Sequence, residues 1–189
     1  MKIILGSSSP WRKNILTEMG YEFGTMSPDI DEKAVRRDDP SELTLALAEA
    51  KSLALRPRLQ EPCVLITSDQ VVVSGGRILE KPSDEAEARA HIRRSGESPT
   101  STVTAVHVIN TADGRQASGV DIVEIDIAPI PDDVARAVIA KGEVYGCAGG
   151  LNISEPLIQP YLRAMRGDLD SVIGLPKKLT QKLIDEVTR

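Results

Sequence analysis

Apolar and polar residues follow two different periods along the chain, and the two periods predict two kinds of element. Runs of aliphatic and β-branched residues predict strands at 1–5, 22–26, 63–67, 71–73, 78–79, 100–110 and 116–127. Apolar residues at helical spacing predict helices at 10–19, 40–55, 84–95, 131–141 and 180–188, with an irregular glycine-rich segment at 142–160. Strands that alternate with helices predict an α/β fold with a mixed sheet.

Caps and turns mark the ends of these elements. Residues typical of N-caps precede three of the predicted helices: Ser9, Asp39 and Ser83. A proline at the first helical position follows the first two of them. A Gly75-Gly76 turn predicts one hairpin, and a turn at Asp113-Gly114 joins the two longest strands into another. The polar triplet 68–70 separates two β-branched runs, so we expect a break in the strand there.

Composition narrows the class of protein. The 189 residues suit one domain, or one domain with two lobes. The net charge of −5, with both signs interspersed, argues against nucleic-acid binding through a general basic surface. No apolar run approaches the ~20 residues that span a bilayer, and Met1 begins no signal-peptide pattern, so we expect a cytoplasmic protein without a membrane partner. Cys63 and Cys147 match neither a metal-ligand spacing nor a disulfide framework.

The segment LGSSSPWRKNIL, residues 5–16, places hydroxyl groups, two cations and the single tryptophan at the start of the first helix. A helix N-terminus offers free backbone N–H groups and the positive end of the helix dipole, and Arg12 and Lys13 add charge. A phosphate would fit there. An ordinary strand, turn and amphipathic helix with solvated cations explains the same residues equally well, and the spacing of a P-loop is absent.

Four charged residues elsewhere are candidates for chemistry, and each has a simpler explanation. Asp69 interrupts an apolar strand, where burial would require a cation, a metal or a substrate as partner, unless it caps backbone N–H groups in a turn. Lys51 lies on an apolar-rich helix, and its simpler explanation is a lysine at the edge of the solvated face. Lys81 leaves a strand end just before a proline, and Glu32 is either a metal ligand or a solvated loop acid.

The order and spacing of these residues resembles the Maf family of nucleoside triphosphate pyrophosphatases. SSSPWRK is similar to the family's S-x-S-P-x-R motif, and DIDEK to its acidic loop. LALAEAKSLAL resembles its helix with a lysine, and SDQVVVSGGRILEKP its aspartate strand followed by a K-P junction. GEVYGCAGG and DSVIGLP resemble its glycine-rich segment and its closing N-V-x-G-L-P motif. The resemblance runs from Leu5 to Leu179, almost the entire chain.

This resemblance implies a fold, an activity and partners. The implied fold is a single domain over residues 1–189, of the α/β class, with an elongated mixed sheet flanked by helices and two lobes around a cleft, as in Maf and Ham1 proteins and anticodon-binding-like folds. The implied activity is that of a house-cleaning hydrolase that cleaves the α–β phosphoanhydride of a nucleoside triphosphate to a monophosphate and pyrophosphate. The implied cofactor is a divalent metal cation, Mg²⁺ or Mn²⁺, and the family commonly forms homodimers.

The resemblance also implies roles for individual residues. Asp69 would be the general base, and Glu32 together with Asp69 would hold the metal. The residues expected to bind the triphosphate are Ser7, Ser8, Arg12, Lys51 and Lys81.

One branch of the family carries S-P-W-R, S-D-Q and C-A-G followed by a glutamate, and it hydrolyses 7-methyl-GTP. This chain has SPWR, SDQ and CAGGLNISE, which implies Trp11, Gln70 and Glu155 as selectivity residues. The chemistry is consistent, because an indole stacks on the cationic 7-methylguanine ring and a carboxylate accepts from its N1–H and exocyclic amine. The chain departs from the branch at Glu80, at Asp170-Ser171 and in the loosely matching NISEPLIQPY, which affects the assignment of Glu155 most.

Two alternative functions stay open at this point. The first is a pyrophosphatase of the same fold for dTTP and UTP or for non-canonical nucleotides. The second is a nucleotide-binding regulator of cell division without turnover, against which the intact Asp69, Lys51, Lys81 and Glu32 argue.

Overall fold

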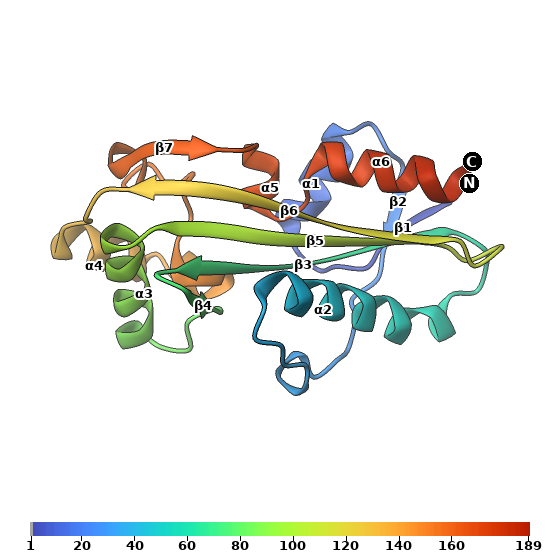
Figure 1. Cartoon of the computed structure of the whole chain (residues 1–189), viewed down its shortest axis with the longest axis horizontal. Helices are drawn as coiled ribbons and strands as arrows, with labels where there is room; N and C mark the ends of the chain where they lie inside the picture. The colour runs from blue at the N-terminus through green and yellow to red at the C-terminus, as the bar shows by residue number, and fades with distance from the viewer. Residues whose placement is uncertain (1) are drawn as a thin grey trace. The chain divides into compact units, whose positions relative to one another are not determined.

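The computed structural model describes residues 2–189, which divide into two compact units. Unit 1 contains residues 2–70, Thr104–Asp121 and Asp168–Arg189, and unit 2 contains Val71–Val103 and Ile122–Gly167. The described residues form a seven-stranded sheet of order β2-β1-β3-β5-β6-β7, with β4 paired to β3 (Figure 1). The expected mixed α/β class is confirmed, since β1 pairs in parallel with β2 and β3 whereas β3 and β4 are antiparallel.

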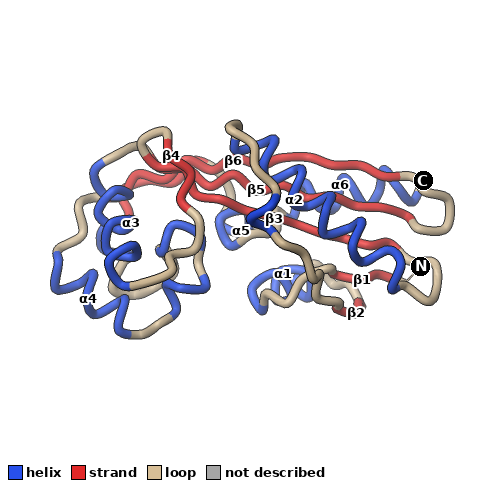
Figure 2. Tube along the Cα trace, turned by 90° about the horizontal axis from the view of Figure 1, so that it is seen from below, coloured by secondary structure: helices blue, strands red, loops and turns tan. Residues whose placement is uncertain are grey.

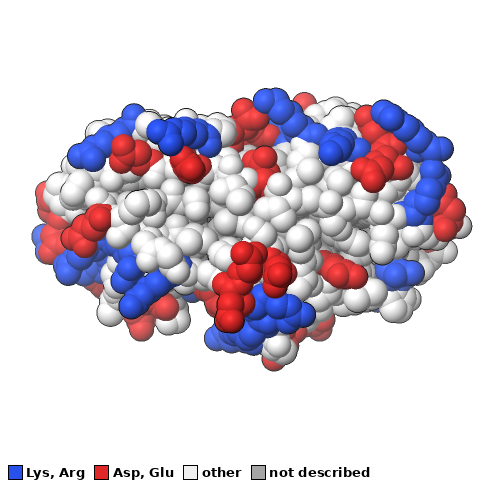
Figure 3. All heavy atoms as spheres, viewed as in Figure 1, with Lys and Arg blue, Asp and Glu red and all other residues white. Residues whose placement is uncertain are grey.

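The strands, drawn red in Figure 2, are β1 (Ile3–Leu5), β2 (Phe23–Thr25), β3 (Val64–Ser74), β4 (Arg77–Leu79), β5 (Thr100–Asn110), β6 (Gln116–Ile127) and β7 (Leu162–Arg166). The α-helices are α1 (Pro10–Glu18), α2 (Pro40–Leu55), α3 (Glu85–Glu97), α4 (Asp132–Ala140), α5 (Leu169–Ile173) and α6 (Lys177–Thr188). None of the helices in the described part of the chain is long and apolar enough to cross a bilayer. Acidic and basic side chains are intermixed on the face that Figure 3 shows.

In unit 1 the strands bury both faces, because successive side chains of a strand point to opposite sides of a sheet. One face packs against α1 and α6, in a core formed by Ile3, Leu5, Ile15, Leu16, Val64, Ile66, Val106, Val108, Leu175, Leu183, Ile184 and Val187. The other face packs against α2, and its core consists of Ile4, Leu55, Cys63, Leu65 and Ile109 (Figure 1). Residues 64 and 66 of β3 thus belong to one layer, and residue 65 belongs to the other.

The polar triplet 68–70 does not interrupt β3, so the prediction of two separate strand runs was wrong. The strand continues without a break because its polar side chains find partners on both faces. On the face toward α2, Thr67 donates to the Ala48 carbonyl at 2.7 Å and Asp69 pairs with Lys51. On the other face, Ser68 donates to the Gly174 carbonyl, beyond α5, at 3.0 Å. Hydrogen-bonded in this way, the triplet costs little to bury.

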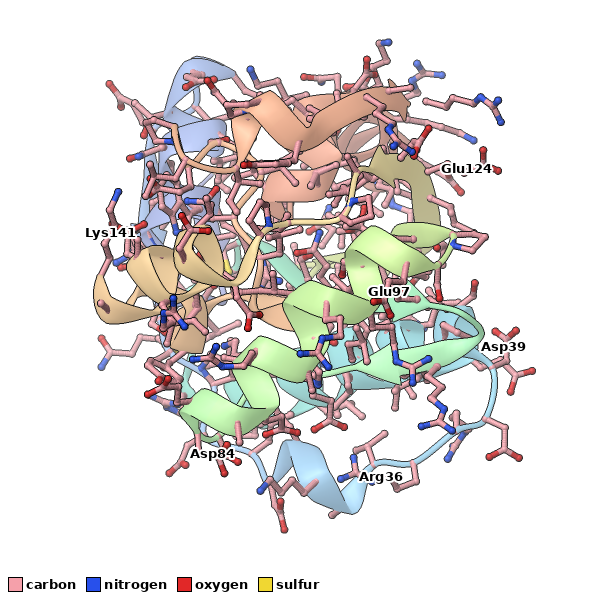
Figure 4. The ribbon with its side chains drawn as sticks, turned by 90° about the vertical axis from the view of Figure 1, so that its left-hand side faces the viewer. Arg36, Asp39, Asp84, Glu97, Glu124 and Lys141 are labelled. Atoms are coloured by element: carbon pink, nitrogen blue, oxygen red, sulfur yellow. The ribbon has the colours of Figure 1, made fainter. Side chains whose placement is uncertain are left out.

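Two of the three predicted N-caps are confirmed. The side chains of Ser9 and Asp39 accept backbone N–H groups in the first turns of α1 and α2. The cap of α3 is Asp84, which Figure 4 labels at the start of the helix, and not Ser83. Asp84 accepts from the N–H of Glu87 at 2.8 Å, while Ser83 donates to the Glu87 carboxylate. Both residues can cap a helix, and the register of the first turn decides between them.

Unit 2 contains the hairpin of β3 and β4, the helices α3 and α4, and several short 3₁₀ turns. Gly75 and Gly76 both have positive φ, at 54° and 72°, as a two-residue hairpin turn of this type requires. The helices pack around a second core of Ala88, Ile92, Ala135, Val138, Ile139, Val144 and Ile158. The structure adds β7, which pairs with β6, and α5, and it starts α6 at Lys177, one turn before the predicted helix.

Candidate functional site

The centre of the candidate site in unit 1 is a buried ion pair between Asp69 of β3 and Lys51 of α2. Lys51 Nζ lies 2.5 Å from Asp69 Oδ1, and the two side chains are only 7% and 9% exposed. The alternation of β3 directs Asp69 to the same face as Thr67, toward α2. Lys51 lies on the buried side of α2 with Leu47 and Leu55, so it does not belong to a solvated face. Each charge is buried because the other compensates it.

Glu32 adds a second carboxylate to this pair. It begins a 3₁₀ turn, Glu32–Ala34, which Asp31 caps by accepting from the N–H of Lys33. Glu32 Oε1 lies 2.9 Å from Lys51 Nζ, and its side chain is 54% exposed. One lysine therefore lies between a buried carboxylate and an exposed one.

Arg12 is the second cation of the site. Its Nε donates to the Gly174 carbonyl and its Nη1 to the Ser68 carbonyl, each at 2.9 Å. The contact with the Ser68 carbonyl places the guanidinium beside the residue that precedes Asp69, and the charges of Asp69 and Glu32 both favour the charged form of Arg12. The structure therefore brings together four of the residues predicted from the sequence: Arg12, Glu32, Lys51 and Asp69.

Burial controls the protonation of this group. It raises the pKa of the Asp69 carboxyl above its ordinary value, and Lys51 and Arg12 partly offset the rise by favouring the carboxylate. Burial lowers the pKa of the Arg12 guanidinium, against the opposite effects of Asp69 and Glu32. An arginine remains charged in proteins despite such a shift, so Arg12 supplies a permanent positive charge.

The residues before and at the start of α1 differ in their exposure to solvent. Ser7 is buried and its Oγ accepts from the N–H of Ser9 at 3.1 Å, while Ser8 is exposed. Trp11, in the first turn of α1, is 45% exposed. An indole exposed to this extent is available for stacking and is not core filler.

Gln70 points to the opposite face of the sheet from Asp69. Its Nε2 lies 2.8 Å from Thr104 Oγ1, 2.8 Å from the Ser171 carbonyl and 2.9 Å from the Val172 carbonyl. The amide nitrogen has only two N–H groups, so these three acceptors engage it fully. Whether Gln70 also determines base preference stays a prediction.

Glu155 and Lys81, the remaining predicted residues, belong to unit 2. Glu155 is 8% exposed, and its Oε1 receives Lys141 Nζ at 2.5 Å and the N–H of Leu157 at 3.2 Å. The hydrogen bond from Lys141 lowers the pKa of the Glu155 carboxyl. Glu155 is therefore a buried, oriented carboxylate. Its partner Lys141, which is labelled in Figure 4, follows α4.

Lys81 is exposed and follows β4. Burial and the charge of Glu143 raise the pKa of the Cys147 thiol, and the positive charge of Lys81 partly offsets that rise. The glycine-rich segment packs against the same part of unit 2, since the Gly149 N–H donates to the Glu80 carbonyl at 3.0 Å. A Cβ at Gly149 would lie 2.9 Å from the Val72 side chain, and its φ is +67°, so only glycine fits there.

The supporting partners of these residues were not predicted from the sequence. Lys141, Ser68 and Thr104 had no expected role, and the motif DSVIGLP did not indicate that the Gly174 carbonyl contacts Arg12. Strand alternation could have indicated that Ser68 and Gln70 share the face opposite Asp69. A pair such as Lys141 and Glu155 has no local signal, because it forms only when α4 and the irregular segment pack together.

Two carboxylates of the site, Glu32 and Asp69, have the oxygen atoms that a hard divalent cation prefers as ligands. Glu32 and Asp69 both direct a carboxylate oxygen at the same point, Lys51 Nζ. One or two carboxylates together with substrate phosphates form the usual ligand set of Mg²⁺. In residues 2–189, no three His, Cys, Asp or Glu side chains form a group that could hold a metal ion.

Comparison with known proteins agrees with this geometry. Residues 2–187 match the family described as Maf-like protein. A 7-methyl-GTP pyrophosphatase from Dictyostelium discoideum is 40% identical and covers 99% of this chain and 98% of its own length. A dTTP/UTP pyrophosphatase from Vibrio vulnificus (strain YJ016) is 30% identical over 98% of each chain. A 7-methyl-GTP pyrophosphatase from Vibrio vulnificus (strain CMCP6) is 29% identical over 93% of this chain and 89% of that one. These matches, which span almost the full length, show that the chain belongs to the Maf family.

Proposed function

We propose that this chain is a nucleoside triphosphate pyrophosphatase that prefers 7-methyl-GTP. The observation that carries the proposal is the buried Asp69 carboxylate, held by Lys51 in a region that also contains Glu32 and Arg12. The relative from Dictyostelium discoideum, which matches over the full length at 40% identity, is a 7-methyl-GTP pyrophosphatase and supports both the reaction and the substrate.

In the proposed reaction a water oxygen attacks the α-phosphorus, and the bond between that phosphorus and the oxygen bridging to the β-phosphorus breaks. Asp69 accepts the proton that the water loses, and pyrophosphate leaves with the bonding electron pair. Because burial raises the pKa of Asp69, its carboxylate is a stronger base than an ordinary aspartate. Lys51 keeps the carboxylate oriented through their hydrogen bond.

The cations of the site neutralise the triphosphate. Arg12 and Lys51 supply charge in unit 1, and the backbone before α1 with Ser7 and Ser8 supplies hydrogen bonds at a helix N-terminus. Lys81 is proposed as a further phosphate ligand. Developing charge on the phosphoryl oxygens is stabilised most where the surrounding donors are fixed in advance, as Arg12 is by its two carbonyl contacts.

Glu32 and Asp69 are the residues that would hold Mg²⁺ or Mn²⁺. Such an ion, when bound, polarises the phosphoryl oxygens and offsets their negative charge. The 54% exposure of the Glu32 side chain leaves this carboxylate accessible to an ion that arrives from solvent with the substrate.

The preference for 7-methyl-GTP rests on Trp11 and Glu155. The exposed indole of Trp11 offers a π face to a cationic base, a contact worth about 0.5–2 kcal/mol. Glu155 is an ionised, buried carboxylate that can accept from the N1–H and amine of guanine. The relative from Vibrio vulnificus that acts on dTTP and UTP, at 30% identity, supports the alternative preference for pyrimidines.

A panel of triphosphates tests the proposal: pyrophosphate release is measured for 7-methyl-GTP, GTP, dTTP, UTP and dITP, each with Mg²⁺ and with Mn²⁺. The highest kcat/KM is expected for 7-methyl-GTP. A higher kcat/KM for dTTP or UTP would contradict the proposed preference for 7-methyl-GTP but would leave the proposed reaction in place. Tight binding of 7-methyl-GTP without any product would instead indicate a nucleotide-binding regulator.

The resemblance to the family also carries two proposals about the whole molecule, a homodimer and a cytoplasmic location. Sedimentation of the purified chain tests the first, and fractionation of cells that express it tests the second.

A further inference from the structure

The guanidinium of Arg12 is fixed by two backbone carbonyls from distant parts of unit 1. Nη1 donates to Ser68, which immediately precedes Asp69 on β3, and Nε donates to Gly174, 162 residues further along the chain. A guanidinium has five N–H donors in one plane. Two bonds to two different carbonyls therefore set the orientation of that plane without using every donor.

The Gly174 carbonyl is itself held in place. Gly174 ends α5 with a φ of +115°, and its carbonyl also accepts from Ser68 Oγ at 3.0 Å. A Cβ at this position would lie 3.3 Å from Arg12 Nε. The close contact with Arg12 and the positive φ both favour glycine here.

Gln70 and Thr104 attach the end of α5 to the sheet. Gln70 Nε2 contacts the carbonyls of Ser171 and Val172, and Thr104 Oγ1 donates to the Ser171 carbonyl at 3.0 Å. Gln70 Nε2 also contacts Thr104 Oγ1, so the two side chains form one network. The carbonyls that they bind lie two and three residues before Gly174.

We propose that Gln70 acts as a positioning residue, which orients Arg12 through the last turn of α5 and the Gly174 carbonyl. The amide nitrogen of Gln70 is engaged by three acceptors of unit 1, and it lies on the sheet face opposite Asp69. Loss of these bonds releases the turn that carries Gly174, and Arg12 then loses one of its two carbonyl contacts. That Arg12 meets the triphosphate rests on the proposed function.

The kinetic test compares Gln70→Met and Thr104→Val with the wild-type chain on 7-methyl-GTP and dTTP. Gln70→Met preserves the length of the side chain but has no donor, and a small displacement of Arg12 is expected to lower kcat/KM about 10- to 100-fold for both substrates. The ratio of the kcat/KM values for the two substrates is expected to stay the same within about threefold, which corresponds to a free-energy difference below 1 kcal/mol. Thr104→Val shows a smaller loss of the same kind, and Thr104→Ser restores it.

Two controls separate positioning from a loss of stability. Thr102→Val removes a buried hydroxyl from the same strand, and in the described residues this hydroxyl has no hydrogen-bond partner, so wild-type activity is expected. Gln70→Met is also made in an Arg12→Ala background, where no further loss in kcat/KM is expected. A tenfold or larger change in the substrate ratio, or an equal loss in the Arg12→Ala background, would overturn the proposal.

A measurement without turnover distinguishes failure of this inference from failure of the proposed function. The Arg12 Nε–H resonance, assigned by its absence in Arg12→Ala, is expected to shift and to exchange faster with water in Gln70→Met but not in Thr102→Val. An unchanged resonance refutes the positioning role. A wild-type chain that releases no pyrophosphate, but whose resonance responds as expected, refutes only the proposed function.

Discussion

Asp69 and Gln70 are neighbours on β3, and they serve opposite faces of the sheet. Asp69 pairs with Lys51 of α2, whereas Gln70 contacts the carbonyls of α5. The alternation of a strand thus splits the short SDQ motif into a proposed catalytic carboxylate and a proposed positioning residue. The side chain of Ser68 lies on the same face as Gln70 and donates to the Gly174 carbonyl, while the backbone carbonyl of Ser68 accepts from Arg12.

Asp69→Asn is expected to fold normally and to lose turnover. The amide has nearly the same shape and still accepts from Lys51, but it cannot take a proton from water. General-base assistance is typically worth ~10²- to 10⁴-fold, so kcat is expected to fall within that range. Steady-state kinetics with 7-methyl-GTP measures the loss, and near-UV circular dichroism checks the fold. Wild-type kcat in this variant would remove Asp69 from the role of base.

Lys51→Met is expected to shift the acid limb of the pH profile to higher pH. Asp69 is active as a carboxylate, so activity is lost as the pH falls through its pKa. Lys51 lowers that pKa, and its removal therefore raises it further above the ordinary value. Profiles of kcat/KM against pH measure the limb, and Lys51→Arg, which keeps the charge, is the control. A limb at the same pH in both variants would show that another group controls activity.

Glu32→Gln is expected to raise the Mg²⁺ concentration needed for half-maximal activity, because it removes one of the two proposed anionic ligands. The expected rise is about tenfold or more. Asp29→Asn, which removes a charge from an exposed residue of the same loop, is the matched control. Titrations with Mg²⁺ and Mn²⁺ at saturating substrate make the comparison. Equal metal requirements in the two variants would contradict a metal-binding role for Glu32.

Trp11→Leu is expected to reduce the preference for 7-methyl-GTP over GTP. Leucine keeps an apolar surface but has no π face, so it loses the cation–π contact and retains the hydrophobic one. A contact worth ~0.5–2 kcal/mol corresponds to a change of about 2- to 30-fold in the ratio of kcat/KM values. Trp11→Phe keeps a π face and is expected to retain part of the preference. An unchanged ratio in Trp11→Leu would mean that the indole does not stack on the base.

Asp84→Ala is expected to destabilise the chain by about 1 kcal/mol, the usual cost of losing a helix N-cap. Ser83→Ala is the control, and its free energy of unfolding is expected to stay within about 0.5 kcal/mol of the wild-type value, as for other exposed sites. Urea unfolding of both variants tests which of the two adjacent residues caps α3. A larger loss in Ser83→Ala than in Asp84→Ala would contradict the assignment.

Local signals predicted much of the fold. The bounds of α2 follow from the Asp39-Pro40 start and the Arg56-Pro57 end, and those of β5 and β6 from their long β-branched runs and the turn between them. The segments that the sequence analysis missed are short and polar or are stabilised by neighbours. β7 has the sequence LRAMR, and α5 has five residues and contacts Gln70 and Thr104.

The candidate site could be predicted only in part. Asp69 and Lys51 were identifiable because a charge inside an apolar run needs a partner. Their mutual contact, and the position of Glu32 on the same lysine, depend on the packing of α2 against β3 and have no counterpart in local sequence. The break expected at 68–70 was wrong for the same reason, since the partners that make the triplet compatible with a strand come from residues 51, 104 and 171–174.

The hydrogen bond between Arg12 and the Gly174 carbonyl has a consequence for synthesis of the protein. The carbonyl that orients Arg12 is translated 162 residues after Arg12 itself. A nascent chain can therefore form the first strand and helix long before it can set the guanidinium in place. Ribosome-bound chains stalled before residue 168 should lack turnover, and activity should appear only when the segment that contains Gly174 has emerged.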